Sequence, residues 1–158
     1  MAYGEHEYQV SVQWIGNRGS GTSGYREYGR DHTIHAGSKP DIPGSSDAEF
    51  LGDAGRWNPE DLLVASVSTC HKLWYLHLCS DAGIVVLDYL DHAEVTMVDN
   101  SDRGHFTQIV LRPHVTISMG GDRGLAERLH HAAHEKCYIA NSVNFPIVCE
   151  PTIEFAAT

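Results

Sequence analysis

Residues 58–79 decide the fold of this chain, and they read NPEDLLVASVSTCHKLWYLHLC. Asn58 can accept hydrogen bonds from free backbone N–H groups, Pro59 suits the first helical position, and Glu60 lies at the positive end of the helix dipole. From residue 62 to 78, apolar residues occupy almost every side of the helical wheel, a pattern typical of a helix enclosed by protein. The sequence therefore predicts a long buried helix around which the rest of the chain folds.

Length and charge narrow the class of protein. The chain has 158 residues and a formal charge of −10, with 21 acidic residues against 11 lysines and arginines. Such a field repels phosphate backbones and anionic lipids, so neither nucleic acid nor a membrane is expected as a partner. No apolar run approaches the roughly 18 residues of a membrane span, and the first residues do not resemble a signal peptide. We expect one soluble, cytoplasmic domain over residues 1–158.

The residues before this helix predict a hairpin and a long loop. Alternation of apolar and polar residues over 8–14 indicates a first strand, and residues 25–35 form a second extended segment that can pair with it. Residues 37–57 are rich in Gly, Ser, Pro and Asp. They predict a loop with at most a short extended segment at residues 49–51.

Residues 80–83 are expected to end this helix, and the residues after them predict more strands and one more helix. Residues 85–98 and 106–119 are two strand candidates that should pair antiparallel, with Pro113 at a bulge or an edge. Asp122 is the expected cap of an amphipathic helix, and residues 147–156 form the last strand. Because strands and helices do not alternate regularly, the predicted class is α+β, with antiparallel sheets wrapped around the central helix.

The four cysteines point to thiol chemistry rather than to a disulfide scaffold. They are too few and too widely spaced for such a scaffold or for a zinc knuckle. Cys79 lies on the opposite side of the predicted helix from Cys70, and we interpret Cys79 and Cys149 as small buried hydrophobic residues. Cys70 and Cys137 can form a pair only if tertiary packing brings their helices together, which the sequence does not show.

Several motifs together resemble the OsmC/Ohr family, whose names stand for osmotically inducible protein and organic hydroperoxide resistance protein. The sequence Asn58-Pro59-Glu60 followed by Cys70 on one apolar helix resembles the central motif of that family. Gly29-Arg30-Asp31 resembles its Gly-Arg-Asp motif, and residues 137–141 resemble the site of its second cysteine. The order and spacing match over nearly the whole chain. The resemblance implies an OsmC-like fold and an intertwined homodimer with two sites at the subunit interface.

The resemblance also implies a thiol peroxidase that reduces organic hydroperoxides and is regenerated by a dithiol, for example of the lipoyl type. Cys70 is the expected nucleophile, and Cys137 is expected to resolve its sulfenic acid as a disulfide. Arg30 is expected to stabilise the Cys70 thiolate, held by a bidentate pair with Glu60. Arg26 is the alternative cation if the strand register differs. No metal and no cofactor are expected.

Helix geometry constrains this predicted site. Leu73, Trp74 and His77 share a helical face with Cys70 and are the expected lining of a substrate pocket. Ten helical residues span roughly 15 Å, so Glu60 cannot touch Cys70 of the same chain. Either Arg30 bridges the gap or the pair comes from the partner subunit.

Three alternatives remain open from the sequence. His130 and His134 have the i,i+4 spacing of a possible metal-binding pair. His71 or His77 could act as a base for Cys70 in a cysteine hydrolase. A non-enzymatic redox-sensing or small-molecule-binding module could use the same fold and the same two cysteines.

Overall fold

The computed structural model describes residues 3–158, and these divide into two compact units whose boundary lies between residues 62 and 63. The first unit contains a three-stranded antiparallel sheet of β1 (Ser11–Trp14), β2 (His32–His35) and β3 (Ile42–Gly44), in that order. The predicted hairpin of the first two strands is confirmed, with Val12 opposite Ile34. The third strand was not predicted, and residues 48–50 form a short 3-10 helix, η1 (Ala48–Phe50), where an extended segment was expected.

The long helix α1 (Pro59–Asp81) begins where its capping signals predict. The Asn58 side chain accepts a hydrogen bond from the N–H of Asp61 at 2.7 Å, which satisfies one of the free donors of the first turn. At the other end Gly83 has a φ of 72°, a left-handed conformation that glycine adopts without strain and that commonly follows a helix. The stop predicted at residues 80–83 is therefore confirmed.

The second unit contains two mixed three-stranded sheets. One has the order β4 (Val86–Asp91), β7 (Pro113–Ile117) and β9 (Thr152–Phe155); the other has the order β5 (Glu94–Val98), β6 (His105–Leu111) and β8 (Ile147–Cys149). The pairs β4–β7 and β5–β6 are antiparallel, as predicted, whereas β6–β8 and β7–β9 are parallel. The expected antiparallel pairing is therefore confirmed for these two pairs, and each sheet is mixed because its third strand is parallel.

Each predicted long strand is in fact two strands that belong to different sheets. The break is at Asp91, whose carboxylate accepts hydrogen bonds from the Arg112 N–H at 2.7 Å and from the Ser68 hydroxyl. Pro113 is then the first residue of the central strand β7, a position where a missing N–H is tolerated. The predicted bulge or edge position for Pro113 was wrong.

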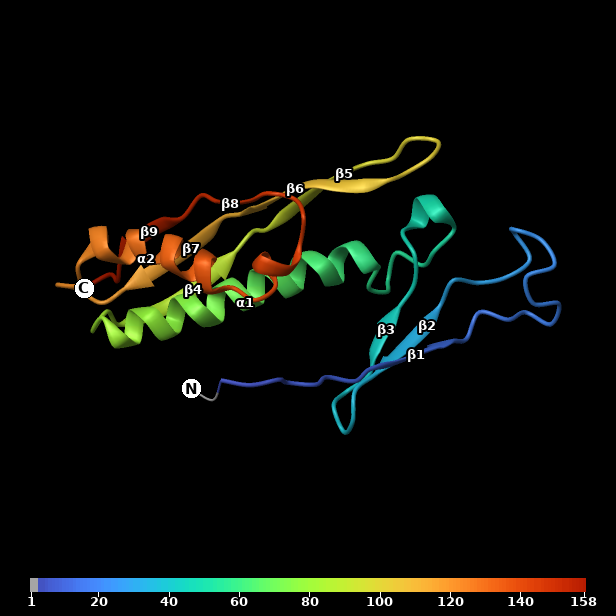
Figure 1. The fold of residues 1–158 in the computed structure, drawn as a ribbon, viewed down its shortest axis with the longest axis horizontal. Helices are drawn as coiled ribbons and strands as arrows, with labels where there is room; N and C mark the ends of the chain where they lie inside the picture. Colours follow the sequence, from blue (N-terminus) through green and yellow to red (C-terminus); the bar gives the residue numbers. More distant parts are fainter. Residues whose placement is uncertain (1–2) are drawn as a thin grey trace. The chain divides into compact units, whose positions relative to one another are not determined.

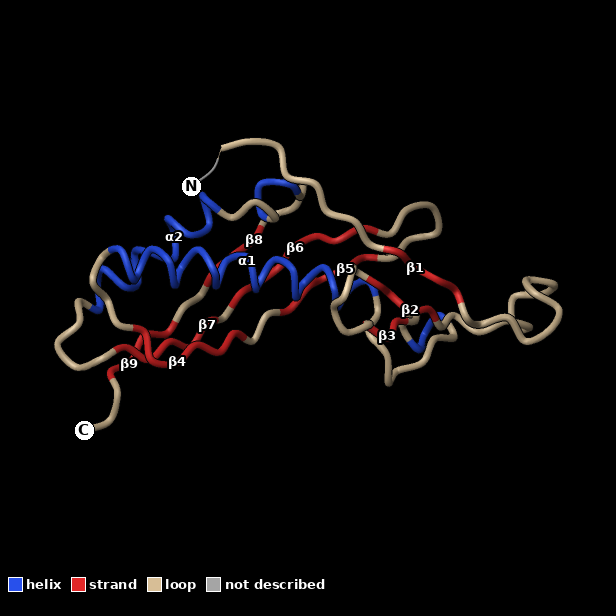
Figure 2. The backbone as a smooth tube through the Cα atoms, turned by 90° about the horizontal axis from the view of Figure 1, so that it is seen from below, coloured by secondary structure: helices blue, strands red, loops and turns tan. Residues whose placement is uncertain are grey.

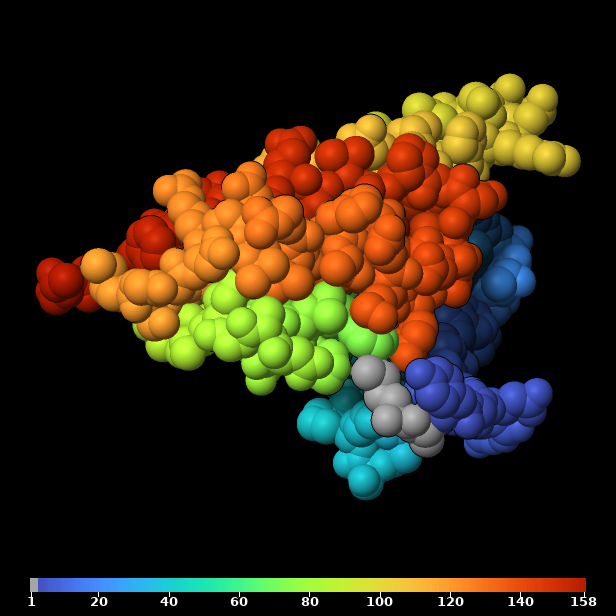
Figure 3. Space-filling view, turned by 60° about the vertical axis from the view of Figure 1, so that its left-hand side comes forward, coloured from blue at the N-terminus to red at the C-terminus, as the bar shows by residue number. Residues whose placement is uncertain are grey.

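Both helices of the second unit lie on one side of its strands (Figure 2). The second helix, α2 (Arg123–Lys136), is capped by Asp122, which accepts a hydrogen bond from the Leu125 N–H at 2.9 Å. The surfaces of α1 and α2 meet, as the green and orange parts of Figure 3 show, and Figure 1 labels both helices and the strands behind them. Tyr75 and Cys79 of α1 pack with Ala126 and Ala133 of α2 in the larger core cluster.

One face of α1 is buried, and it runs across both sheets. The fully buried residues of this helix are Val67, His71, Tyr75 and Cys79, at intervals of four. Val67 packs in a second cluster with Ile109 and Leu111 of β6. Leu73, by contrast, is 63% exposed. Within a single chain the helix therefore has one buried stripe and is not enclosed all round.

Candidate dithiol site

Two cysteines from different helices lie together in the second unit. Cys70 is half-buried in the middle of α1, Cys137 is fully buried directly after α2, and both are free thiols. Burial raises the pKa of Cys137 to about 11; the Ala140 N–H, 3.4 Å from its sulfur, acts against this shift, and a side-chain hydrogen bond with Cys70 adds to it. The structure thus brings together two thiols that are 67 residues apart in the sequence.

The Trp74 side chain of α1 contacts both residues that flank Cys137 in the chain, Lys136 and Tyr138. Trp74 makes edge-to-face contacts with His77 and with Tyr138, at centroid distances of 5.8 Å and 5.6 Å. The Lys136 ammonium lies 5.6 Å from the Trp74 ring, within the range of a cation–π contact. Of the three residues expected to line a pocket, Trp74 and His77 are therefore in contact, and Leu73 projects into solvent. Tyr138 was not among the predicted residues.

Arg30 lies in the first unit, where backbone carbonyls and aromatic rings hold it. Its guanidinium donates hydrogen bonds to the carbonyls of Tyr28 and Tyr25, and it lies 4.0 Å and 4.5 Å from the centroids of their rings. Arg30 also lines a pocket of about 300 Å³ formed by residues 15–18, 29–31 and 51–53. Within residues 3–158 of one chain, no ion pair joins Arg30 to Glu60.

The aspartate of the Gly-Arg-Asp motif has partners that the sequence did not indicate. The Ser45 hydroxyl donates to the Asp31 carboxylate at 2.9 Å, and the Arg56 Nε lies 3.9 Å from its other oxygen. Arg56 also donates to the carbonyls of Gly44 and His32. These contacts join the motif to β3 and to the loop before α1. No local pattern predicts them, because the partners are 12 or more residues apart.

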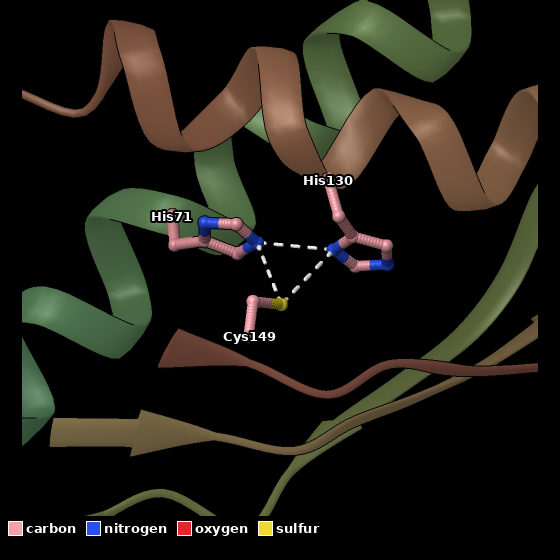
Figure 4. A group of neighbouring side chains, drawn as sticks. All are labelled: His71, His130 and Cys149. Atoms are coloured by element: carbon pink, nitrogen blue, oxygen red, sulfur yellow. Dashed lines mark hydrogen bonds between the residues drawn. The ribbon is translucent and has the colours of Figure 1, made fainter. Parts of the chain in front are cut away.

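A second cluster of reactive side chains lies in the same unit. His71 of α1, His130 of α2 and Cys149 of β8 point toward one another (Figure 4). The Nε2 of His71 is 3.0 Å from the Nδ1 of His130, and the Cys149 sulfur is 3.8 Å from each nitrogen. Burial lowers the pKa of His71 to about 4 and that of His130 to about 3, so both imidazoles are neutral near pH 7.

This cluster bears on two of the alternatives left open by the sequence. His130 is directed toward His71 and Cys149, rather than forming a two-histidine site with its i,i+4 neighbour His134. The Nε2 of His71 is engaged by His130 and Cys149, so it is not oriented as a base for Cys70. The sequence analysis missed the cluster because its members are 19 to 78 residues apart.

The second unit combines two mixed sheets with a long helix that crosses both of them. Its two neighbouring thiols come from the middle of α1 and from the residue directly after α2. Together these features define a distinct α+β class of protein. The family model for OsmC-like proteins matches residues 52–152, and the chain belongs to this family. The predicted resemblance is therefore confirmed. No curated protein sequence matches the chain.

Solved structures agree with this assignment. An OsmC-like protein of unknown function from Vibrio cholerae is 30% identical, with a TM-score of 0.85 over 94% of this chain and 100% of that one. An organic hydroperoxide resistance protein from Legionella pneumophila is 19% identical, with a TM-score of 0.66 over 96% and 98% of the two chains. The corresponding protein of Bacillus subtilis is 20% identical, with a TM-score of 0.60 over 94% and 98%. The last two show a shared fold.

Proposed function

We propose that this protein is a cysteine-based thiol peroxidase that reduces organic hydroperoxides to alcohols. The observation that carries the proposal is the contact between the two reduced thiols, Cys70 and Cys137. The Cys70 side chain is partly exposed, whereas the Cys137 side chain is fully buried. This difference suits a nucleophile paired with a resolving cysteine. Structural neighbours named as organic hydroperoxide resistance proteins support the substrate class.

The proposed cycle has three balanced steps. The Cys70 thiolate attacks one peroxide oxygen, the O–O bond breaks, and the alkoxide takes a proton and leaves as the alcohol. The Cys137 sulfur then attacks the Cys70 sulfenic acid, so that an S–S bond forms, the S–O bond breaks and water leaves. An external dithiol reduces this disulfide and is itself oxidised to a disulfide. The cycle needs thiols that are kept reduced, which favours the cytoplasm.

Arg30 is proposed to assist the first step, contributed by the same subunit or by its partner. Its guanidinium would stabilise the thiolate and the charge that develops on the leaving oxygen. Aromatic rings and carbonyls already fix Arg30 within its own unit. Glu60 is proposed to pair with this arginine across the subunit interface. Leu73, Trp74 and His77 would provide an apolar and aromatic surface for the organic part of the substrate.

The first unit supports the proposal of an intertwined homodimer. None of the fully buried hydrophobic residues of the chain lies in the described part of residues 1–62, and Val12, Trp14 and Ile42 of its sheet are all exposed. A three-stranded sheet needs a hydrophobic face packed against something to be stable. A second copy of the chain would supply that surface, and the 63% exposed Leu73 marks an uncovered part of α1 as well.

Mapping of the disulfide tests the proposed function. Reduced protein is treated with one equivalent of an organic hydroperoxide, the remaining thiols are counted, and peptides are analysed by mass spectrometry. We expect a disulfide between Cys70 and Cys137, formed faster than with hydrogen peroxide and reversed by a dithiol. The variant Cys70→Ser should lose no thiols, whereas the control variant Cys149→Ser should form the same disulfide. An unreactive Cys70, or a disulfide that includes Cys149 in the unmodified chain, would refute the proposal.

A further inference from the structure

The cluster of His71, His130 and Cys149 has no role in the proposed peroxidase cycle. One atom of each side chain points to a common point, and these three atoms lie within 4.8 Å of one another. A zinc ion with bonds of about 2.0 Å to nitrogen and about 2.3 Å to sulfur holds such atoms about 3.3–3.7 Å apart. The separations of 3.0 Å and 3.8 Å in the structure bracket that range. Small rotations of the side chains would therefore make room for one ion.

The protonation of the two histidines suits metal binding. Because burial keeps both rings neutral near pH 7, each has a lone pair to offer. One ring proton is now shared between the Nε2 of His71 and the Nδ1 of His130. The other nitrogen of His130, Nε2, is buried without a hydrogen-bond partner. Nε2 of His130 can therefore hold the ring proton, so that the lone pair of Nδ1 is offered to a cation while the imidazole stays neutral.

The charges around the cluster also favour a cation. Burial, followed by the carboxylates of Asp91 and Glu150, raises the pKa of the Cys149 thiol to about 12. The Asp91 carboxylate also acts against the lowering of the His71 pKa by burial. Without a cation the Cys149 thiol stays protonated and is a poor nucleophile. A coordinated metal ion deprotonates such a thiol outright, so that binding forms one metal–sulfur bond and releases the thiol proton.

We propose that His71, His130 and Cys149 form a buried binding site for a transition-metal ion of the zinc class. Two imidazoles and one thiolate are ligands of the kind that Zn²⁺ prefers, and a water molecule would fill the fourth position. The ligands come from α1, α2 and β8, so the ion links the two helices to one sheet. Metal binding of this kind adds to the stability of the folded chain. This proposal does not depend on the peroxidase activity.

Direct binding to the whole protein tests the site. Chelator-treated, reduced protein is titrated with Zn²⁺ in competition with a coloured chelator, and separately with Co²⁺, whose thiolate charge-transfer absorption reports a sulfur ligand. We expect one ion per chain, a Co²⁺–thiolate band, and a higher thermal midpoint with Zn²⁺. The variants Cys149→Ser and His130→Gln should weaken Zn²⁺ binding by about a hundredfold or more, and Cys149→Ser should abolish the band.

Two controls separate this site from other possible ligands. His131→Gln removes an exposed histidine of α2 whose contact is Glu135, and it should leave binding unchanged. The double variant Cys70→Ser/Cys137→Ser removes the dithiol and should also leave it unchanged. Loss of binding in either control, or no stoichiometric binding by the unmodified chain, would overturn the proposal.

A further measurement covers the case in which the cluster variants do not fold. X-ray absorption spectroscopy of the Zn²⁺-loaded, unmodified protein should show one sulfur and two imidazole ligands. A shell with two sulfur ligands, or with none, would contradict the site without the use of any variant.

Discussion

The two buried histidines predict a loss of stability in mild acid. His71 is 1% and His130 is 3% exposed, and burial lowers their pKa values from 6.5 to about 4 and about 3. Between pH 6.5 and about pH 4 the unfolded chain binds protons at these positions and the folded chain does not, so stability falls as the pH falls. At pH 5 this amounts to about 2 kcal/mol for each histidine, or ~4 kcal/mol for the pair, at 1.36 kcal/mol per pKa unit.

Urea unfolding at pH 7.5 and pH 5.0 measures this loss at a fixed protein concentration and with a chelator present, so that neither association nor metal binding changes with pH. The wild type should lose ~4 kcal/mol of unfolding free energy. The double variant His71→Gln/His130→Gln should lose correspondingly less over the same interval, whatever its stability at pH 7.5. His131→Gln should behave as the wild type. A wild type whose stability is equal at the two pH values, or a double variant with the full loss, would show that these two histidines are not held neutral by the fold.

Three other predictions concern single side chains. Asn58→Ala removes the cap of α1 and should lower the free energy of unfolding by about 1 kcal/mol in urea. Tyr89→Phe removes a buried hydroxyl that has no hydrogen-bond partner, so the same measurement should show no loss or a gain; a loss above about 1 kcal/mol would mean that the hydroxyl is satisfied. Arg30→Gln should slow the loss of the Cys70 thiol to hydroperoxide by about a hundredfold. The matched control Arg26→Gln, at an exposed position, should leave that rate unchanged. Equal slowing in both variants would contradict a specific role of Arg30 in the reaction of Cys70.

The sequence predicted the features that depend on local physical chemistry. Asn58 and Asp122 identified the starts of both helices because their side chains bond to N–H groups only three residues away. Gly83 marked the end of α1 because few other residues adopt its positive φ without strain. The β5–β6 pairing followed from the short turn between two alternating segments.

Features that depend on distant contacts were not predictable in the same way. The Asp91 side chain divides two long strands by accepting the N–H of Arg112, 21 residues away. The strand β8 pairs in parallel with β6, and β9 pairs in parallel with β7. In each pair the two strands are separated in the sequence by an entire helix. The sequence contains eleven histidines, and nothing local distinguishes His71 and His130 as members of a cluster with Cys149. Only tertiary packing brings α1, α2 and β8 together.

The motifs indicated some features of the dithiol site and left others open. The resemblance implied a partnership between Cys70 and Cys137, and in the structure the two side chains lie within hydrogen-bonding distance. The place of Arg30 relative to Cys70 was left open by the sequence and depends on how the two units and a second subunit assemble. The structure adds the Trp74–Tyr138 contact beside Cys137, which the helical wheel could not show, since Tyr138 lies outside α1.

Turnover is the most direct test of the proposed peroxidase. The protein is incubated with a large excess of an organic hydroperoxide and of a lipoyl-type dithiol, and the alcohol produced per chain is measured over time. We expect many alcohol molecules per Cys70, none with Cys70→Ser, and a rapid loss of activity by overoxidation with Cys137→Ser. Production that stops at one alcohol per chain while the dithiol remains in excess would contradict an enzyme and indicate a redox sensor.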